Sequence, residues 1–82
     1  MAIIRGGLLL YQEEAIGDID GVNKTFTTSY PFLSETIRVL LNGLELRSPD
    51  DYVIIDSSTF QLNYAPIGGS DPDTLVVSYQ RV

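Results

Sequence analysis

The side chains that could do chemistry in this chain are mostly carboxylates grouped in turn-like segments. Asp18, Asp20 and Asn23 place three oxygen donors close to the turn residue Gly21. Calcium prefers six to eight oxygen ligands, and the spacing of an EF-hand loop is absent because no glutamate follows at the required distance. Asp and Asn side chains often bond their own backbone in turns. We therefore predict a turn at this segment rather than a metal site.

Two further acidic pairs, Asp50-Asp51 and Asp71-Pro72-Asp73, could be compared with the two carboxylates of a glycosidase. A chain of 82 residues with few helices offers little material for a deep cleft, so solvated loop charge is the simpler interpretation. The chain contains no histidine and no cysteine. This removes the commonest general base, the commonest zinc ligand and every thiolate. We predict that the protein is not an enzyme, holds no metal and carries no cofactor.

The overall charge argues against two classes of partner. With a net charge of −6 and a pI of about 4.1, the chain is repelled by phosphate backbones and by anionic membrane surfaces. It has no stretch of roughly 20 apolar residues that could span a bilayer. We expect no nucleic-acid and no membrane partner, and synthesis in the cytoplasm. The acidity could steer the chain toward a basic protein.

Alternating side chains from Lys24 onward predict short strands separated by turns. Asn42-Gly43 suits a two-residue turn, which would join a strand beginning at Ile37 to one ending at Leu46. Six to eight such strands predict an all-β fold, either a small antiparallel β-sandwich or a partly open barrel. The expected core consists of Phe26, Ile37, Val39, Leu41, Leu44, Leu46, Ile54, Phe60, Leu62, Leu75, Val77 and Tyr79.

The first sixteen residues differ from the rest, so we divide the chain into a segment of residues 1–16 and a sandwich domain of residues 17–82. One interpretation of the first segment is an ordinary strand from Leu8 to Gln12 that adds to the sheet. The other is an extended N-terminal arm that packs on another subunit, with Gly6-Gly7 as its hinge.

Aromatic and aliphatic side chains outside the expected core are the best candidates for binding a partner, because tyrosine is enriched at interfaces. Tyr52, Tyr64 and Tyr79 are expected at the margins of the core. Tyr11 and Tyr30 are better interface candidates, and Leu40 lies on the polar side of its hairpin. The predicted partner-binding residues are Ile3, Ile4, Leu8, Leu9, Leu10, Tyr11, Tyr30 and Leu40.

Five pieces of sequence, in order from Asp20 to Tyr79, resemble small β domains of tailed-bacteriophage virion proteins. They are Asp20-Gly21-Val22-Asn23-Lys24-Thr25-Phe26-Thr27, Arg38-Val39-Leu40-Leu41-Asn42-Gly43-Leu44, Asp50-Asp51-Tyr52-Val53-Ile54, Phe60-Gln61-Leu62-Asn63-Tyr64-Ala65-Pro66 and Asp73-Thr74-Leu75-Val76-Val77-Ser78-Tyr79. Such domains occur in tail-fibre, neck and head-decoration proteins. The resemblance implies a β-sandwich that serves as a structural module without catalytic residues.

From this resemblance we expect a structural component of a tailed-phage virion, made in the host cytoplasm and located in the particle. It would act in capsid decoration, in the neck, or in tail or fibre attachment, as a homo-oligomer that binds other virion proteins. The alternative is a carbohydrate-binding β-sandwich module, although such sites usually use exposed planar aromatics and the chain has no tryptophan. A small hydrolase is a third hypothesis, which the missing histidine disfavours.

Overall fold

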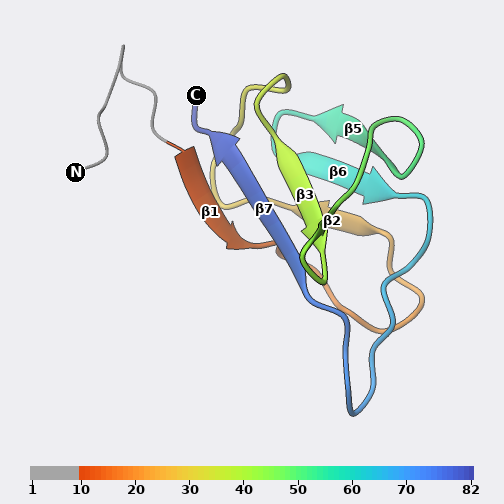
Figure 1. Cartoon of the computed structure of the whole chain (residues 1–82). Helices are drawn as coiled ribbons and strands as arrows, with labels where there is room; N and C mark the ends of the chain where they lie inside the picture. Colours follow the sequence, from red (N-terminus) through yellow and green to blue (C-terminus); the bar gives the residue numbers. More distant parts are fainter. Residues whose placement is uncertain (1–9) are drawn as a thin grey trace.

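The computed structural model of the chain describes residues 10–82 and confirms the predicted all-β fold. Its strands form two antiparallel sheets, one ordered β1-β7-β3-β4 and the other β2-β6-β5. Figure 1 shows β1, β7 and β3 side by side, with the second sheet behind them, so that the fold is a small sandwich. The strands are β1 (Leu10–Glu14), β2 (Thr25–Thr27), β3 (Arg38–Leu41), β4 (Leu44–Glu45), β5 (Tyr52–Asp56), β6 (Thr59–Leu62) and β7 (Leu75–Gln80).

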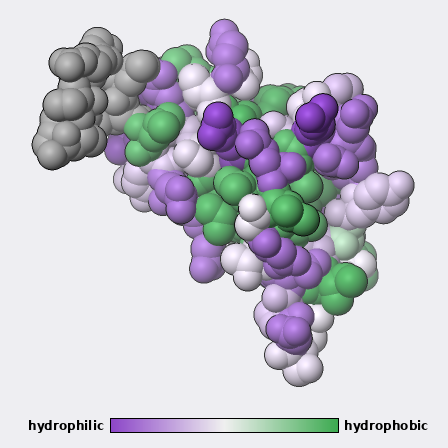
Figure 2. All heavy atoms as spheres, in the orientation of Figure 1, coloured by the Kyte–Doolittle hydropathy of each residue, from purple (hydrophilic) through white to green (hydrophobic). Residues whose placement is uncertain are grey.

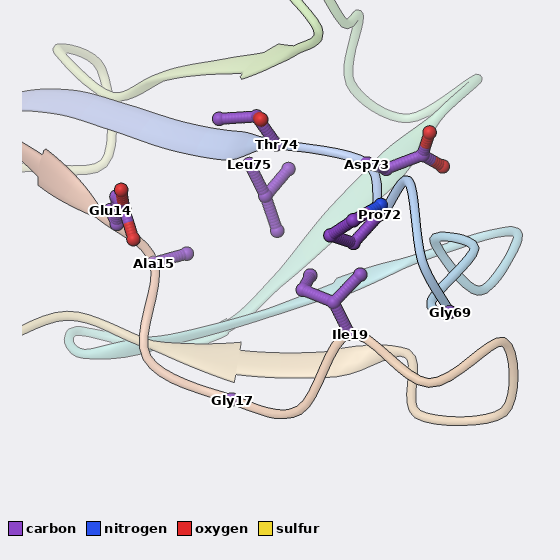
Figure 3. A pocket seen from close by; sticks show the side chains of 9 residues that line it. All are labelled: Glu14, Ala15, Gly17, Ile19, Gly69, Pro72, Asp73, Thr74 and Leu75. Carbon is purple, nitrogen blue, oxygen red and sulfur yellow. The ribbon is translucent and has the colours of Figure 1, made fainter.

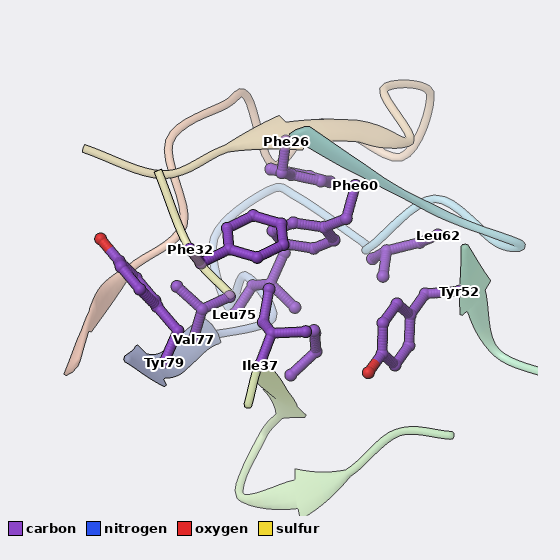
Figure 4. Packing of buried hydrophobic residues seen from close by; sticks show 10 residues of the cluster. Phe26, Phe32, Ile37, Tyr52, Phe60, Leu62, Leu75, Val77 and Tyr79 are labelled. Atoms are coloured by element: carbon purple, nitrogen blue, oxygen red, sulfur yellow. The ribbon is translucent and has the colours of Figure 1, made fainter. Parts of the chain in front are cut away.

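The core lies between the two sheets and is rich in aromatic rings. Phe26 of β2 stacks on Phe60 of β6 with ring centroids 6.1 Å apart, and Tyr52 of β5 meets Phe60 edge-on at 6.2 Å. Figure 4 shows these rings facing Val77 and Tyr79 of β7 across the sandwich. The buried hydrophobic residues are Phe26, Phe32, Ile37, Val39, Tyr52, Phe60, Leu62, Leu75, Val77 and Tyr79.

The predicted hairpin is present, and its glycine is required by the backbone. Asn42 has φ 53° and Gly43 has φ 86°, which are the positive values of the expected tight turn. Leu41 pairs with Leu44 and Leu40 pairs with Glu45, as the turn predicts. The Asn42 side chain donates to Asp73 Oδ1 at 2.9 Å and accepts from the Thr74 backbone N–H at 2.8 Å, which fastens the turn to the start of β7.

Two expectations about burial were wrong. Leu44 was expected in the core, yet it is 73% exposed. Leu44 lies on the inner side of the sheet, but its strand β4 is short and at the edge of that sheet. Among the described residues, the second sheet does not extend far enough to cover the Leu44 side chain. Tyr64 was expected at the core margin, yet it is 83% exposed because β6 ends at Leu62, two residues before it.

The part of the N-terminal segment that the structure describes forms a strand. β1 includes Leu10 to Gln12 of the expected strand, continues to Glu14, and pairs with β7 along its whole length. Tyr11 faces the core, whereas Leu10 is 71% exposed on the opposite side of the sheet. The predicted partner-binding residues Ile3, Ile4, Leu8 and Leu9 lie outside the described residues.

The turns before β2 and before β7 are held against each other at one end of the sandwich. The Gly21 backbone N–H donates to the Pro66 carbonyl at 2.8 Å. A Cβ atom on Gly68 would lie 2.3 Å from the Ile19 carbonyl oxygen, so only glycine permits this approach. Residues 10–82 include no helix long and apolar enough to cross a membrane.

Candidate partner-binding surface

Tyr11, Tyr30 and Arg81 form a compact group, which we call the tyrosine–arginine cluster. The rings of Tyr11 and Tyr30 meet edge-on at 89°, with centroids 5.3 Å apart. The guanidinium carbon of Arg81 lies 3.5 Å from the centroid of the Tyr30 ring and 5.8 Å from that of Tyr11. The structure therefore brings together the two tyrosines that the sequence selected as interface candidates, and it adds a cation to them.

Backbone pairing at the end of β7 places this cluster. The segment before β3 runs beside the C-terminal residues, where Phe32 forms an isolated bridge with Arg81. The Leu33 N–H donates to the Gln80 carbonyl at 3.0 Å, and the Val82 N–H donates to the Pro31 carbonyl at 3.0 Å. Because Phe32 is buried, this segment is fixed to the core while Tyr30 remains 37% exposed.

A carboxylate beneath the cluster ties three segments together. Glu13 Oε2 accepts from the Tyr79 hydroxyl at 2.6 Å and from the Ser29 backbone N–H at 2.8 Å. Glu13 Oε1 accepts from the Ser29 hydroxyl at 2.6 Å. Glu13 is on β1, Tyr79 is on β7 and Ser29 precedes Tyr30, so the bonds fix the position from which Tyr30 projects.

The ionisation of this carboxylate follows from its surroundings. Burial alone would raise the pKa of Glu13, but hydrogen bonds from Ser29 and Tyr79 outweigh burial and hold the pKa below its ordinary value. Burial, with the hydrogen bond to Glu13 and its negative charge, raises the pKa of Tyr79 to about 12. At neutral pH the carboxylate is ionised and the phenol is protonated. Both Glu13 oxygens are occupied by structural hydrogen bonds, so this group serves as an anchor.

The remaining described candidates lie on a different face. Leu40 pairs with Val76 and Glu45 on the outer face of the four-stranded sheet, where it is half-buried. Leu10 is on this outer face too, beside a shallow depression of about 470 Å³ that Arg38 also lines. Leu10 and Leu40 are therefore separate from the tyrosine–arginine cluster, which faces the inner side and edge of the sandwich.

Sequence reasoning missed Glu13 and Arg81. Both roles depend on pairing between distant parts of the chain, because Glu13 meets Tyr79 across 66 positions. A signal for Arg81 was present in its place two residues after Tyr79, on the parity of the inward-facing side chains of the last strand. Nothing local to Glu13 distinguishes it from its neighbour Glu14.

The acidic turns use their carboxylates to bind backbone. Asp20 Oδ1 accepts from the N–H groups of Val22 at 2.9 Å and Asn23 at 2.8 Å, and these bonds lower the pKa of Asp20. The Asn23 amide donates to the Thr25 carbonyl at 2.9 Å. These contacts match the turn that the sequence predicts. Within residues 10–82, no three or more Asp, Glu, His or Cys side chains are grouped so as to hold a metal ion.

A hollow of about 450 Å³ lies between the segment after β1 and the loop before β7 (Figure 3). Two carboxylates line it, and Figure 3 shows Glu14 and Asp73 on opposite sides. Asp73 accepts from the Asn42 amide at 2.9 Å and from the Ile67 N–H at 2.8 Å, and these bonds lower its pKa. The Asp73 carboxylate thus connects the turn at Asn42 to the loop at Ile67.

Comparisons with known proteins identify no relative, since no protein-family model, no curated protein and no solved structure matches the chain.

Proposed function

We propose that this chain is an assembly module that binds proteins through its tyrosine–arginine cluster. The observation that carries the proposal is the Arg81 guanidinium 3.5 Å above the Tyr30 ring, at a surface where both side chains reach solvent. Tyrosine and arginine are among the residues that contribute most to binding energy in protein interfaces. A stacked pair offers a broad apolar surface together with donors that can bind a carbonyl or carboxylate of a partner.

The network below the cluster supports this function. Immobilising flexible side chains on binding costs roughly 0.5–1.5 kcal/mol for each. Tyr11 already packs against the Tyr79 ring at 5.7 Å, and the bonds of Glu13 with Ser29 hold the chain next to Tyr30. Much of the ordering is therefore complete before a partner arrives, which favours binding.

The biological setting is proposed from the sequence pieces between Asp20 and Tyr79 that resemble virion domains. We assign the chain to a tailed-phage particle, in capsid decoration, the neck, or tail or fibre attachment. It would be made in the host cytoplasm and reside in the virion as a homo-oligomer bound to other virion proteins. In such a particle many copies act together, so that individually weak contacts give strong overall attachment.

The phage assignment is tested on tailed-phage particles released by cells that encode this chain. Mass spectrometry of gradient-purified particles should detect the chain at a constant ratio to a major head or tail protein. Its absence from such particles would show that the phage assignment is wrong.

The binding surface is tested with particles assembled without the chain, to which purified chain is added back. Co-sedimentation should saturate for the parent chain. Tyr30→Ala and Arg81→Ala should each weaken it by at least tenfold, since a tenfold loss corresponds to about 1.4 kcal/mol. Val22→Ala is the matched control because Val22 is 78% exposed on a distant turn. Equal binding by all three variants would remove the cluster from the proposal.

The carbohydrate-binding alternative is addressed by the same variants. A sugar ring would need an open aromatic face, and one face of Tyr30 is covered by Arg81. Saturable binding to a glycan array that Tyr30→Ala abolishes would favour this alternative over protein assembly.

A further inference from the structure

A small apolar groove opens at the side of the sandwich away from β1. Its walls are Leu41 and Leu46 of the hairpin region, Leu62 and Tyr64 at the end of β6, and Asp51 before β5; we call it the hairpin groove. Its volume is about 150 Å³, and an apolar cavity of roughly this size can hold a benzene-sized group. Figure 2 shows hydrophobic surface also on the face where β7 and β3 lie in front, which is the outer face of the four-stranded sheet and not the groove itself.

Two exposed apolar side chains lie at or next to the groove. Tyr64 in its wall is 83% exposed, and Leu44, which pairs with the wall residue Leu41, is 73% exposed. Contiguous exposed apolar side chains commonly mark a surface that another group covers. Tyr64 in the groove wall and Leu44 next to it, both expected in or beside the core, are therefore available for contact with another chain.

We propose that the segment of residues 1–9 from a second copy of this chain occupies the hairpin groove. This inference rests on the proposed assembly function and names the partner for one of its contacts. The segment supplies Ile3 and Ile4, and its only charged side chain is Arg5. The groove supplies an apolar floor with Asp51 at its wall and Asp50 next to it, so that Arg5 would meet negative charge.

The reach of the segment favours a second copy over the same chain. Leu10 pairs with Gln80 at one end of β7, whereas Leu41 in the groove pairs with Leu75 at the other end. With strands roughly 4.8 Å apart and residues about 3.3 Å apart along them, a straight line between the two places is about 20 Å. The path over the protein surface is longer than this line. The six residues from Ile4 to Leu10 extend only about 20 Å, so Ile4 does not reach its own groove.

The same placement predicts the kind of assembly. The segment leaves from β1 and the groove lies beside β4, and these strands are the opposite edges of one sheet. A contact between two different surfaces of identical copies is heterologous, and it generates a ring when the rotation closes. Each copy would then give its N-terminal segment to one neighbour and receive a segment from the other.

Cysteine cross-linking tests this inference, because the parent chain has no cysteine. Chains carrying Ile4→Cys are mixed with chains of different mass carrying Tyr64→Cys and exposed to a mild oxidant. We expect mixed disulfide dimers in at least tenfold excess over those formed with Ile67→Cys, the matched control. Ile67 is 66% exposed and does not line the groove. Circular dichroism confirms that each variant keeps its β fold.

A single chain carrying both Ile4→Cys and Tyr64→Cys separates the possible occupants. Cross-linked ladders of several chains support exchange between copies, whereas closure within one chain overturns the inference. Equal cross-linking of Tyr64→Cys and Ile67→Cys also overturns it. The readout is self-association of the purified chain, so it can fail while binding to particles through Tyr30 and Arg81 succeeds. Conversely, cross-linking between copies without particle binding through Tyr30 and Arg81 would support this inference and contradict the proposed particle-binding surface.

Discussion

At the scale of single residues, the contact between Glu13 and Tyr79 has the largest consequence for the candidate surface. Tyr79 is fully buried, its hydroxyl donates to Glu13, and Glu13 in turn accepts hydrogen bonds from Ser29. Removing one partner of such a bond leaves the other unsatisfied, which typically costs about 1–3 kcal/mol. The same contact that stabilises the fold therefore also positions Tyr30.

This contact predicts a loss of stability at alkaline pH. The pKa of Tyr79 is raised from 10.0 to about 12 on folding, by burial first and then by Glu13. Between these values the unfolded chain loses the phenol proton before the folded chain does, so the stabilisation present below pH 10 is lost toward pH 12. The free energy of unfolding, measured in urea at pH 9 and pH 11, should fall more steeply for the parent than for Tyr79→Phe. Burial also raises the pKa of Tyr52. The free energy of unfolding of Tyr79→Phe should therefore still fall somewhat between pH 9 and pH 11. Equal slopes in both proteins would contradict the assignment.

At the scale of elements, β1 predicts where the chain can be shortened. A chain that begins at Leu10 keeps the strand that pairs with β7, whereas one that begins at Gly17 loses Tyr11 and Glu13 from the inner side of the sheet. We expect the longer fragment to unfold in urea with the midpoint of the monomeric parent. The shorter fragment should lose several kcal/mol or fail to fold, because its loss combines buried apolar area with unsatisfied groups on Tyr79 and Ser29. Cooperative unfolding of the shorter fragment at the parental midpoint would show that β1 is dispensable.

The elements also show how far the sequence could predict this structure. Alternation and turn residues are local, so the strands and the hairpin at Asn42-Gly43 were predicted. Parity correctly placed Leu44 on the inner side, but it carries no information about how far the opposite sheet extends. Tyr11 and Tyr30 were selected by residue type. Their meeting with Arg81 depends on the bridge between Phe32 and Arg81, which only the folded chain reveals.

At the scale of the whole molecule, size and surface together favour association. A domain of 82 residues buries only about 60–65% of the surface of its unfolded chain, so its stability margin is small. Leu44 and Tyr64 remain exposed although the core could gain from covering them. A contact that covers this groove in the folded state alone adds its binding free energy to stability, according to mass action.

This linkage predicts that thermal stability depends on protein concentration. If residues 1–9 of one copy bind the hairpin groove of another, the Tm of the parent should rise with concentration, because folded copies are the only state that can associate. A free partner concentration of one hundred times the Kd stabilises the folded chain by about 2.7 kcal/mol. For a domain of this size that corresponds to a rise in Tm of roughly 10–20 °C. Ile4→Asp would place a third carboxylate beside Asp50 and Asp51. It should remove the concentration dependence and leave the variant with the Tm of the dilute parent. Ala2→Asp, in the same segment, is the matched control for added charge. This variant should retain most of the concentration dependence of the Tm. A parent Tm that stays constant across this concentration range would show that the groove is not filled by a second copy.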